Sequence, residues 1–141
     1  MEAYEYHEHT ADIQFTARGK NLEEAFKNAA RATMNIIVNK ESVRPAQKKN
    51  INIKGKDLKA LLYSFIEEII FLVDAEQFIP YDMETLKINR LNKQYWLNTI
   101  IEGETANDKH EFKTPIKAAT YNDMSIKEEK DQVTIKVVVD I

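Results

Sequence analysis

DLKALLYSFIEEIIFLV, residues 57–73, is the stretch that decides the fold of this chain. Asp57 is a residue type favoured at a helix N-cap, and the apolar residues after it recur at the three- and four-residue spacing of a helix. The apolar stripe is broad enough for a helix that packs inside the protein. We therefore predict a central core helix. Its stripe consists of Leu58, Leu61, Leu62, Phe65, Ile66, Ile69, Leu72 and Val73.

One acidic residue of this segment, Glu68, borders the apolar stripe. It follows Phe65 by three residues and precedes Leu72 by four, so the three side chains share nearly one direction. A carboxylate buried without a partner is strongly destabilising, so a buried Glu68 requires a cation, a set of donors or a metal. The alternative is that Glu68 reaches solvent at the margin of the stripe. Glu67 points away from the stripe, and we expect it to be an exposed surface carboxylate.

The remaining chain supplies another helix and several strands. Asn21 with Glu24 resembles a capping box, and the apolar spacing after it predicts a helix over residues 22–37. Alternation of apolar and polar residues predicts strands. They cover residues 13–18, a short segment at 51–53, a hairpin of 86–91 and 94–101 joined at Asn92 and Lys93, and residues 114–121 and 133–141.

These elements define the fold class. We predict α+β: a single domain, residues 1–141, with a mostly antiparallel sheet and two main helices packed on one face. Polar residues at 39–49 and 102–111 indicate loops, and His110 in the second of them is expected at the surface. Trp96 is expected to be a core or sheet-face residue rather than a base-stacking platform, because the surrounding charge does not favour nucleic acid.

Composition limits the function. The 141 residues are 43% hydrophobic and 30% charged, and the net charge of -3 gives no general attraction to nucleic acid, so any contact with RNA is expected to be indirect, weak or local. The sequence has no cysteine, which excludes disulfides, zinc–thiolate sites and thiol nucleophiles. A basic-then-apolar leader and a segment of membrane-spanning length are both absent, so we expect a cytoplasmic protein without a membrane partner.

A second stretch, HEHTAD at residues 7–12, is dense in groups that bind metals or move protons. It holds two imidazoles, two carboxylates and a hydroxyl, which is typical of a metal site or an acid–base pair. The same residues also suit a polar corner between strands, in which Thr10 and Asp12 bind nearby backbone amides. The stretch by itself is compatible with both interpretations.

The predicted last strand favours the metal site. Asp140 and the carboxylate of Ile141 are adjacent at its end, and Asp12 lies on the more polar face of its own strand. If the two strands are neighbours, three carboxylates meet, and such like charges need a cation between them. Oxygen ligands favour Ca²⁺, Mg²⁺ or Mn²⁺ over softer metals. The alternative is a pair of unrelated surface aspartates.

Lys117 is a candidate anion contact. In the predicted strand 114–121 it shares a face with Tyr121, and a lysine beside a phenol is able to hold an anion. Its alternative is a solvated lysine at the edge of a sheet.

A set of short motifs, in order and at matching spacing along essentially the whole chain, resembles the archease family. The motifs are YEY at 4–6 leading into HTADI at 9–13, LEEAF at 22–26, LL at 61–62 through Glu68, KAATY at 117–121, and VDI at 139–141. The resemblance implies a small α+β protein that serves as a cofactor of the GTP-dependent tRNA-splicing RNA ligase. That ligase joins a 3′-phosphate or cyclic-phosphate RNA end to a 5′-hydroxyl end, and archeases assist guanylylation of its active-site histidine.

The resemblance also implies roles for particular residues. Asp12, Asp140 and the Ile141 carboxylate correspond to metal ligands, and Glu68 to a further acidic residue needed for activation. Lys117 lies in a shared motif, and we include it among the residues expected to act in ligase activation. The chain departs from the family at Asn122, where many members have histidine, so an imidazole is not expected to contribute there.

Two other functions compete with ligase activation. One, also associated with this family, is a chaperone-like or specificity modulator of a tRNA methyltransferase. The other is a free-standing metal-dependent hydrolase. Against the hydrolase, the sequence contains no Ser/His/Asp set, no glycine-rich phosphate loop and no glycine-flanked nucleophile. We therefore expect a protein cofactor rather than an enzyme.

Overall fold

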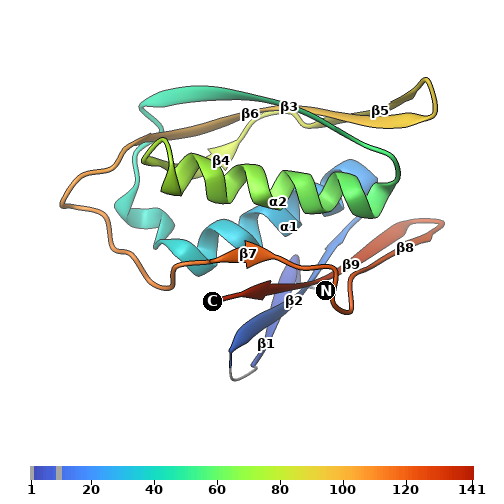
Figure 1. Cartoon of the computed structure of the whole chain (residues 1–141), viewed down its shortest axis with the longest axis horizontal. Helices are drawn as coiled ribbons and strands as arrows, with labels where there is room; N and C mark the ends of the chain where they lie inside the picture. Colours follow the sequence, from blue (N-terminus) through green and yellow to red (C-terminus); the bar gives the residue numbers. More distant parts are fainter. Residues whose placement is uncertain (1, 9–10) are drawn as a thin grey trace.

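Two antiparallel β-sheets enclose two helices in the computed structural model, which describes residues 2–8 and 11–141 (Figure 1). The described elements are β1 (Tyr4–Glu8), β2 (Asp12–Gly19), α1 (Leu22–Ile37), the short 3-10 helix η1 (Lys40–Ser42), β3 (Gln47–Gly55), α2 (Leu58–Asp74), β4 (Phe78–Met83), β5 (Lys87–Leu91), β6 (Gln94–Thr105), β7 (Ala118–Ala119), β8 (Ser125–Glu129) and β9 (Gln132–Asp140).

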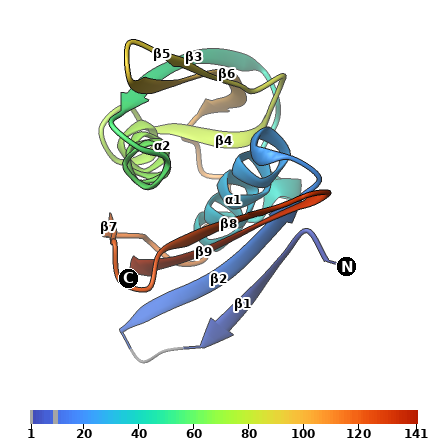
Figure 2. The same ribbon diagram turned by 90° about the vertical axis from the view of Figure 1, so that its right-hand side faces the viewer.

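The molecule has three layers, which Figure 2 shows end-on. The first sheet has the strand order β1-β2-β9-β7, with β8 also paired to β9. The second sheet has the order β3-β6-β4, with β5 also paired to β6. Helices α1 and α2 fill the layer between them, with α1 packed mainly against β2 and α2 mainly against β3. Each sheet therefore has one face against the helices and one outer face.

The α+β class, the antiparallel strands and the two main helices are confirmed. The strands form two sheets rather than one, because the strands between α1 and the final segment pair with one another and not with β2 or β9. Because the two helices pack against one face of each sheet, both sheets contribute to a single hydrophobic core. The core includes Phe15, Phe26, Phe65, Leu97 and Val137, each with an exposed fraction of 0%.

Both helices begin where their capping residues predict. The Asn21 side chain accepts a hydrogen bond from the Glu24 N–H at 2.9 Å, and the Asp57 side chain accepts one from the Ala60 N–H at 2.8 Å. Each contact satisfies one of the backbone donors that a helix leaves free in its first turn. The helix at 22–37 and the core helix after Asp57 are thus confirmed.

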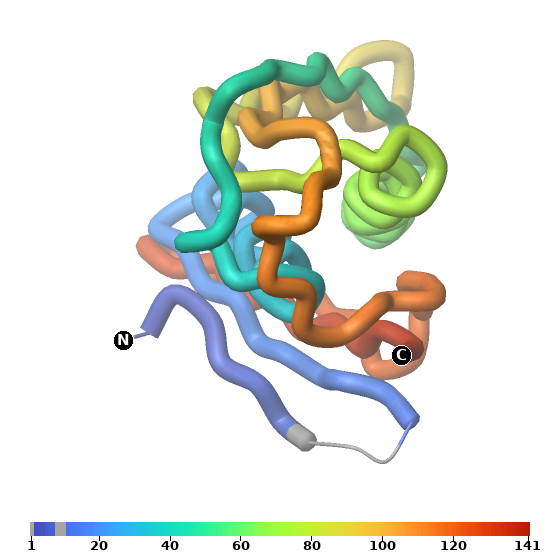
Figure 3. Tube along the Cα trace, turned by 90° about the vertical axis from the view of Figure 1, so that its left-hand side faces the viewer, coloured from blue at the N-terminus to red at the C-terminus, as the bar shows by residue number. Residues whose placement is uncertain are grey.

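The predicted strand at 114–121 is wrong for most of its length. Only Ala118 and Ala119 pair with β9, and the segment before them closes the C-terminal end of α1 instead. The N–H groups of Lys113 and Thr114 donate to the carbonyls of Ile37 and Ile36, at 2.8 and 3.0 Å. Figure 3 shows this orange segment descending from the second sheet to the first. Capping of free helix carbonyls thus takes precedence over the alternating pattern.

Other differences concern strands in polar sequence. The predicted loops at 39–49 and 102–111 contain the start of β3 at Gln47 and the end of β6 at Thr105. Strands β1, β4 and β8 were not predicted as strands, and β4 includes Pro80. The hairpin at Asn92 and Lys93 is confirmed, and both residues have positive φ, 53° and 62°, as a tight two-residue turn requires.

No helix in the described part of the chain is long and apolar enough to cross a membrane.

Candidate functional site

The ends of β2 and β9 bring the two predicted aspartates together. The strands pair antiparallel, and Asp12 lies directly opposite Asp140 in the register. Side chains at opposed positions project from the same face of the sheet, with Cβ atoms about 4.5–5.5 Å apart. The condition on which the metal-site hypothesis depends, that these two strands are neighbours, is met.

The backbone around Asp140 is held from both sides. On one side, Asp140 pairs with Asp12, and the Ile141 N–H donates to the Ala11 carbonyl at 3.4 Å. On the other side, Ala118 of β7 lies opposite Asp140, and the Lys117 N–H donates to the Asp140 carbonyl at 2.8 Å. These bonds fix the end of β9 in the middle of a sheet. A strand end held in this way keeps its carboxylates in place better than a frayed terminus does.

The donor set at this end fits a hard divalent cation. Asp12 and Asp140 supply side-chain carboxylates from opposed positions of the two strands. Among residues 2–8 and 11–141, no group of three His, Cys, Asp or Glu side chains is placed to hold a metal by itself. Additional oxygen ligands have to come from backbone, water or a partner, since Ca²⁺ takes six to eight.

A pocket of about 420 Å³ adjoins Asp12 on the side of α1. Its wall combines aromatic, aliphatic, amide and ammonium groups, so it suits a side chain with both an apolar body and a polar tip. The residues that form it are Tyr6, His7, Asp12, Ile13, Asn35, Ile36, Lys113 and Thr114.

Glu67 is not the exposed surface carboxylate that the helical pattern predicts. Its Oε2 accepts a hydrogen bond from the Ala119 N–H at 2.7 Å, and the residue is partly buried. This bond ties α2 to β7, one residue from the position opposite Asp140. The pattern on α2 fixes the direction of Glu67 but contains no signal that a strand from the end of the chain passes there. The contact of Glu67 is therefore not recognisable from the sequence.

Glu68 lies at the margin of the apolar stripe and is partly buried. Within the described residues its carboxylate makes no hydrogen bond or ion pair, which matches the alternative in which it reaches solvent. The neighbouring Glu67 takes the backbone donor instead. Glu68 thus offers an uncommitted negative charge on the flank of α2.

Lys117 and Tyr121 do not form the shared anion site that a continuous strand would make. β7 ends at Ala119, and the Tyr121 ring stacks on Tyr63 of α2 with centroids 4.4 Å apart. The Lys117 side chain is exposed and forms no ion pair within the described part of the chain. Its backbone places it next to Asp140.

The HEHTAD stretch is only partly described. His9 and Thr10 lie outside the described residues, and so does the side chain of Glu8. His7 is in β1, opposite Gln14, and its Nε2 lies 3.2 Å from the Thr16 hydroxyl. That contact joins β1 to β2 on the outer face of the first sheet.

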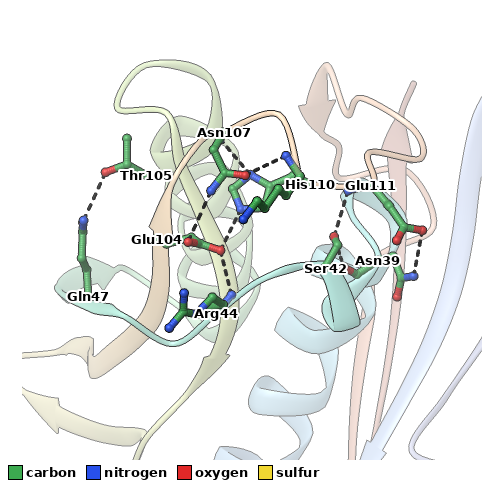
Figure 4. Close-up of polar contacts among 10 residues, drawn as sticks. Asn39, Ser42, Arg44, Gln47, Glu104, Thr105, Asn107, His110 and Glu111 are labelled. Atoms are coloured by element: carbon green, nitrogen blue, oxygen red, sulfur yellow. Dashed lines mark hydrogen bonds and ion pairs between the residues drawn. The ribbon is translucent and has the colours of Figure 1, made fainter.

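His110 is buried, so its predicted surface location is wrong. Its side chain has an exposed fraction of 0%, its Nδ1 accepts from the Asn107 N–H at 3.1 Å, and its Nε2 lies 3.0 Å from Oε2 of Glu104 (Figure 4). Because Nδ1 accepts, Nε2 carries the proton and donates it to Glu104. Hydrogen bonds from His110 and from the Arg44 N–H hold the pKa of Glu104 below its ordinary value. This cluster fastens the segment after β6 and is structural.

Comparison with known proteins identifies relatives along the full chain. The archease protein family matches residues 4–141. A protein archease from Pyrococcus abyssi is 39% identical over 132 residues, covering 93% of this chain and 92% of the relative. One from Methanosarcina mazei is 34% identical over 139 residues, covering 98% and 95%.

This chain is also similar in structure to solved proteins. The solution structure of Methanobacterium thermoautotrophicum protein 1598 superposes with a TM-score of 0.86 at 29% identity and covers 100% of both chains. The crystal structure of an archease from Thermotoga maritima, described as a possible chaperone, has a TM-score of 0.63 at 21% identity and covers 95% of this chain and 94% of its own, which supports the fold. With a family match over residues 4–141 and full-length relatives above 30% identity, the chain belongs to the archease family.

Proposed function

We propose that this protein is an accessory protein of the GTP-dependent tRNA-splicing RNA ligase. It promotes guanylylation and multiple turnover of the ligase through an acidic divalent-metal site at the ends of β2 and β9. The observation that carries the proposal is the register that sets Asp12 opposite Asp140 in a family member. An accessory role also agrees with a sequence that has no nucleophile set of its own.

In this proposal Asp12, Asp140 and the Ile141 carboxylate hold the cation, with Ca²⁺ expected and Mg²⁺ or Mn²⁺ as alternatives. When bound, the cation supplies positive charge that offsets the charge of phosphate oxygens. The pairing of β2, β9 and β7 keeps the carboxylates at a fixed edge, which the chain presents to the ligase. The ligase contributes the histidine that attacks GTP.

Two further residues contribute in this proposal. Lys117 is included because its backbone N–H donates to the Asp140 carbonyl, which places the residue beside the site. Its exposed ammonium group, which forms no ion pair within the described residues, suits a phosphate or a carboxylate of the partner. Glu68, whose carboxylate has no partner among the described residues, provides a charge on α2 that suits a basic group of the ligase. Glu67, committed to Ala119, serves to position β7.

A second candidate, a chaperone-like or specificity modulator of a tRNA methyltransferase, has one observation in its favour. Phe71 and Phe112 are 50% and 55% exposed, and Phe112 lines an apolar pocket of about 370 Å³ at the end of α2. Exposed apolar surface of this kind is typical of protein contacts. The description of the Thermotoga maritima archease as a possible chaperone points the same way.

The test is guanylylation of the purified ligase with GTP and a divalent ion over many turnovers, with and without this protein. We expect wild type to sustain turnover and Asp140→Asn to fail, because the amide keeps the volume and removes the charge. The matched control is Asp131→Asn, an exposed aspartate in the turn between β8 and β9. Equal stimulation by wild type and Asp140→Asn would contradict the metal site. Absence of stimulation by wild type, with altered methyltransferase specificity, would favour the second candidate.

A further inference from the structure

The outer face of the second sheet carries a block of six exposed residues on three neighbouring strands. In one row across the sheet, Lys54 of β3 and Asn89 of β5 both lie opposite Trp96 of β6. In the next row on the same face, Asn52 of β3 and Lys87 of β5 lie opposite Asn98 of β6. We call this block the Trp96 face, and it consists of Asn52, Lys54, Lys87, Asn89, Trp96 and Asn98, all exposed.

The alternate residues of the same strands explain why this face is fixed in place. Ile53, Ile88 and Leu97 point to the opposite side of the sheet and pack in the core or against it. Because the side-chain period of a strand is two, burial of these three residues obliges their neighbours to face outward. Figures 1 and 2 show no element of the described chain above this side of the sheet.

The charge of the Trp96 face differs from that of the whole protein. It has two lysines and no carboxylate, whereas the chain has a net charge of -3. The acidic residues of the same side, Glu84 and Glu102, lie further along the strands, and Glu84 is paired with Lys48 at 3.1 Å. Net charge therefore does not describe the local attraction of this face for an anion.

The polar groups of the face are available to a ligand. Within the described residues, the side-chain amides of Asn52, Asn89 and Asn98 make no hydrogen bond, and Lys87 makes no ion pair. Beyond the Asn98 row, on the side away from Trp96, the surface is hollowed into a shallow pocket of about 280 Å³, lined in part by Asn52, Lys87 and Asn98. A row of amides that both donate and accept, on a rigid sheet, suits base edges and sugar hydroxyls.

Trp96 supplies an aromatic surface at the centre. Its exposed fraction is 36%, and its ring lies under the Lys54 ammonium, 5.4 Å from Nζ to the ring centroid. The indole N–H is directed to the Leu91 carbonyl at 3.4 Å, which sets the orientation of the ring. An indole with an adjacent cation is a stacking platform for an unpaired base, and the lysine is within reach of the neighbouring phosphate.

We propose that the Trp96 face binds a short segment of single-stranded RNA. A base stacks on Trp96, Lys54 and Lys87 contact phosphates, and the asparagine amides contact base edges and 2′-hydroxyls. Three strands spaced about 4.8 Å apart span about 10 Å, which is room for one or two bases, so the affinity is weak and sensitive to salt. The inference does not rest on the proposed function, since the acidic edge belongs to the other sheet.

The chain offers a direct readout, because Trp96 is its one tryptophan. The experiment titrates the full chain at low salt with a short unstructured RNA, and follows tryptophan fluorescence together with anisotropy of the labelled RNA. We expect the RNA to quench the fluorescence, with the same Kd from both signals. Duplex RNA of the same sequence has its bases stacked internally, and DNA lacks the 2′-hydroxyl, so both should bind more weakly.

Variants separate the contributions. Trp96→Ala should weaken binding about tenfold or more, and the double variant Lys54→Gln with Lys87→Gln should reduce the salt slope by about 0.7 per lysine. Phe71→Ala, an exposed aromatic on α2, and Lys130→Gln, an exposed lysine in the turn before β9, are the controls and should bind as wild type. All substituted side chains are exposed, and thermal unfolding verifies that each variant is folded.

Several results would overturn the inference. They are absence of binding at low salt, RNA binding without a change in tryptophan fluorescence, undiminished binding by Trp96→Ala, and equal affinity for duplex RNA. Equal affinity for single-stranded DNA would overturn the assignment to RNA.

Discussion

At the scale of single residues, neighbouring glutamates of α2 have different surroundings. Glu67 accepts a backbone hydrogen bond from Ala119 at 2.7 Å, whereas Glu68 has no such contact within the described residues. Helical phase predicts the direction of each side chain from sequence. It does not predict the partner of Glu67, because β7 comes from a distant part of the chain. Glu67 is therefore held within the fold, whereas we propose that Glu68 contacts a partner.

This division predicts opposite effects of two substitutions. Glu67→Ala should lower the free energy of unfolding by about 1.5–3 kcal/mol, the loss of a hydrogen bond to a charged group. Glu68→Gln should leave stability near that of wild type and reduce ligase guanylylation, because the amide keeps the volume and removes the charge. Denaturant unfolding and guanylylation rate, measured on the same preparations, give both quantities. A stable, fully active Glu67→Ala protein, or full activation by Glu68→Gln, would count against this assignment.

His110 shows another limit of residue-level prediction. A histidine in a polar, acidic segment has the sequence context of a surface loop, yet its side chain is fully buried between Glu104 and Asn107. The burial follows from the path of the segment after β6, which sequence alone does not give. The consequence for Glu104 is a pKa held below its ordinary value by the hydrogen bonds of His110 and the Arg44 N–H.

The Glu104 shift predicts a pH dependence of stability. A carboxyl whose pKa is lowered by folding stabilises the protein above its unfolded pKa, and this contribution is lost as pH falls through the lower folded value. Stability should therefore decrease in acid, below the ordinary pKa of 4.5. In Glu104→Gln this part of the decrease should be absent, while the decrease from other carboxyls remains. Urea unfolding of both proteins from neutral to acidic pH measures the difference, and superimposable pH profiles would refute it.

At the scale of elements, the helices were predictable because each has a capping residue and a long apolar stripe. The strands at sheet edges were less predictable from the sequence. The edge strand β3 begins in polar residues, because only one of its faces is covered by the helices. Its outward side chains include Lys48 and Asn50. The segment before β7 has the alternation of a strand, but its N–H groups bind the carbonyls that end α1. Competition for free backbone groups is a tertiary effect that a local pattern does not contain.

At the scale of the whole molecule, two sheets around one helical layer give two separate outer surfaces. On the first sheet Asp12 and Asp140 lie opposite each other at the ends of their strands, and the second sheet presents the lysines and the indole of the Trp96 face. The sequence made the site conditional on β2 and β9 being neighbours, and in the structure they pair. The division into two sheets was not predictable from strand patterns, because they give no information on which strands pair.

Calcium titration by calorimetry tests the metal site, the central claim, most directly. The comparison is between the unextended chain and a variant with one glycine added after Ile141. The added residue moves the terminal charge by about 3.5 Å, beyond the coordination distance of about 2.3–2.6 Å. The apolar face of β9 is unchanged, so unfolding without metal should occur at the same temperature. We predict that the unextended chain binds calcium and that the extended variant has a clearly lower affinity for it. Equal affinity in the two proteins would remove the Ile141 carboxylate from the site, and absence of binding in both would contradict the metal site altogether.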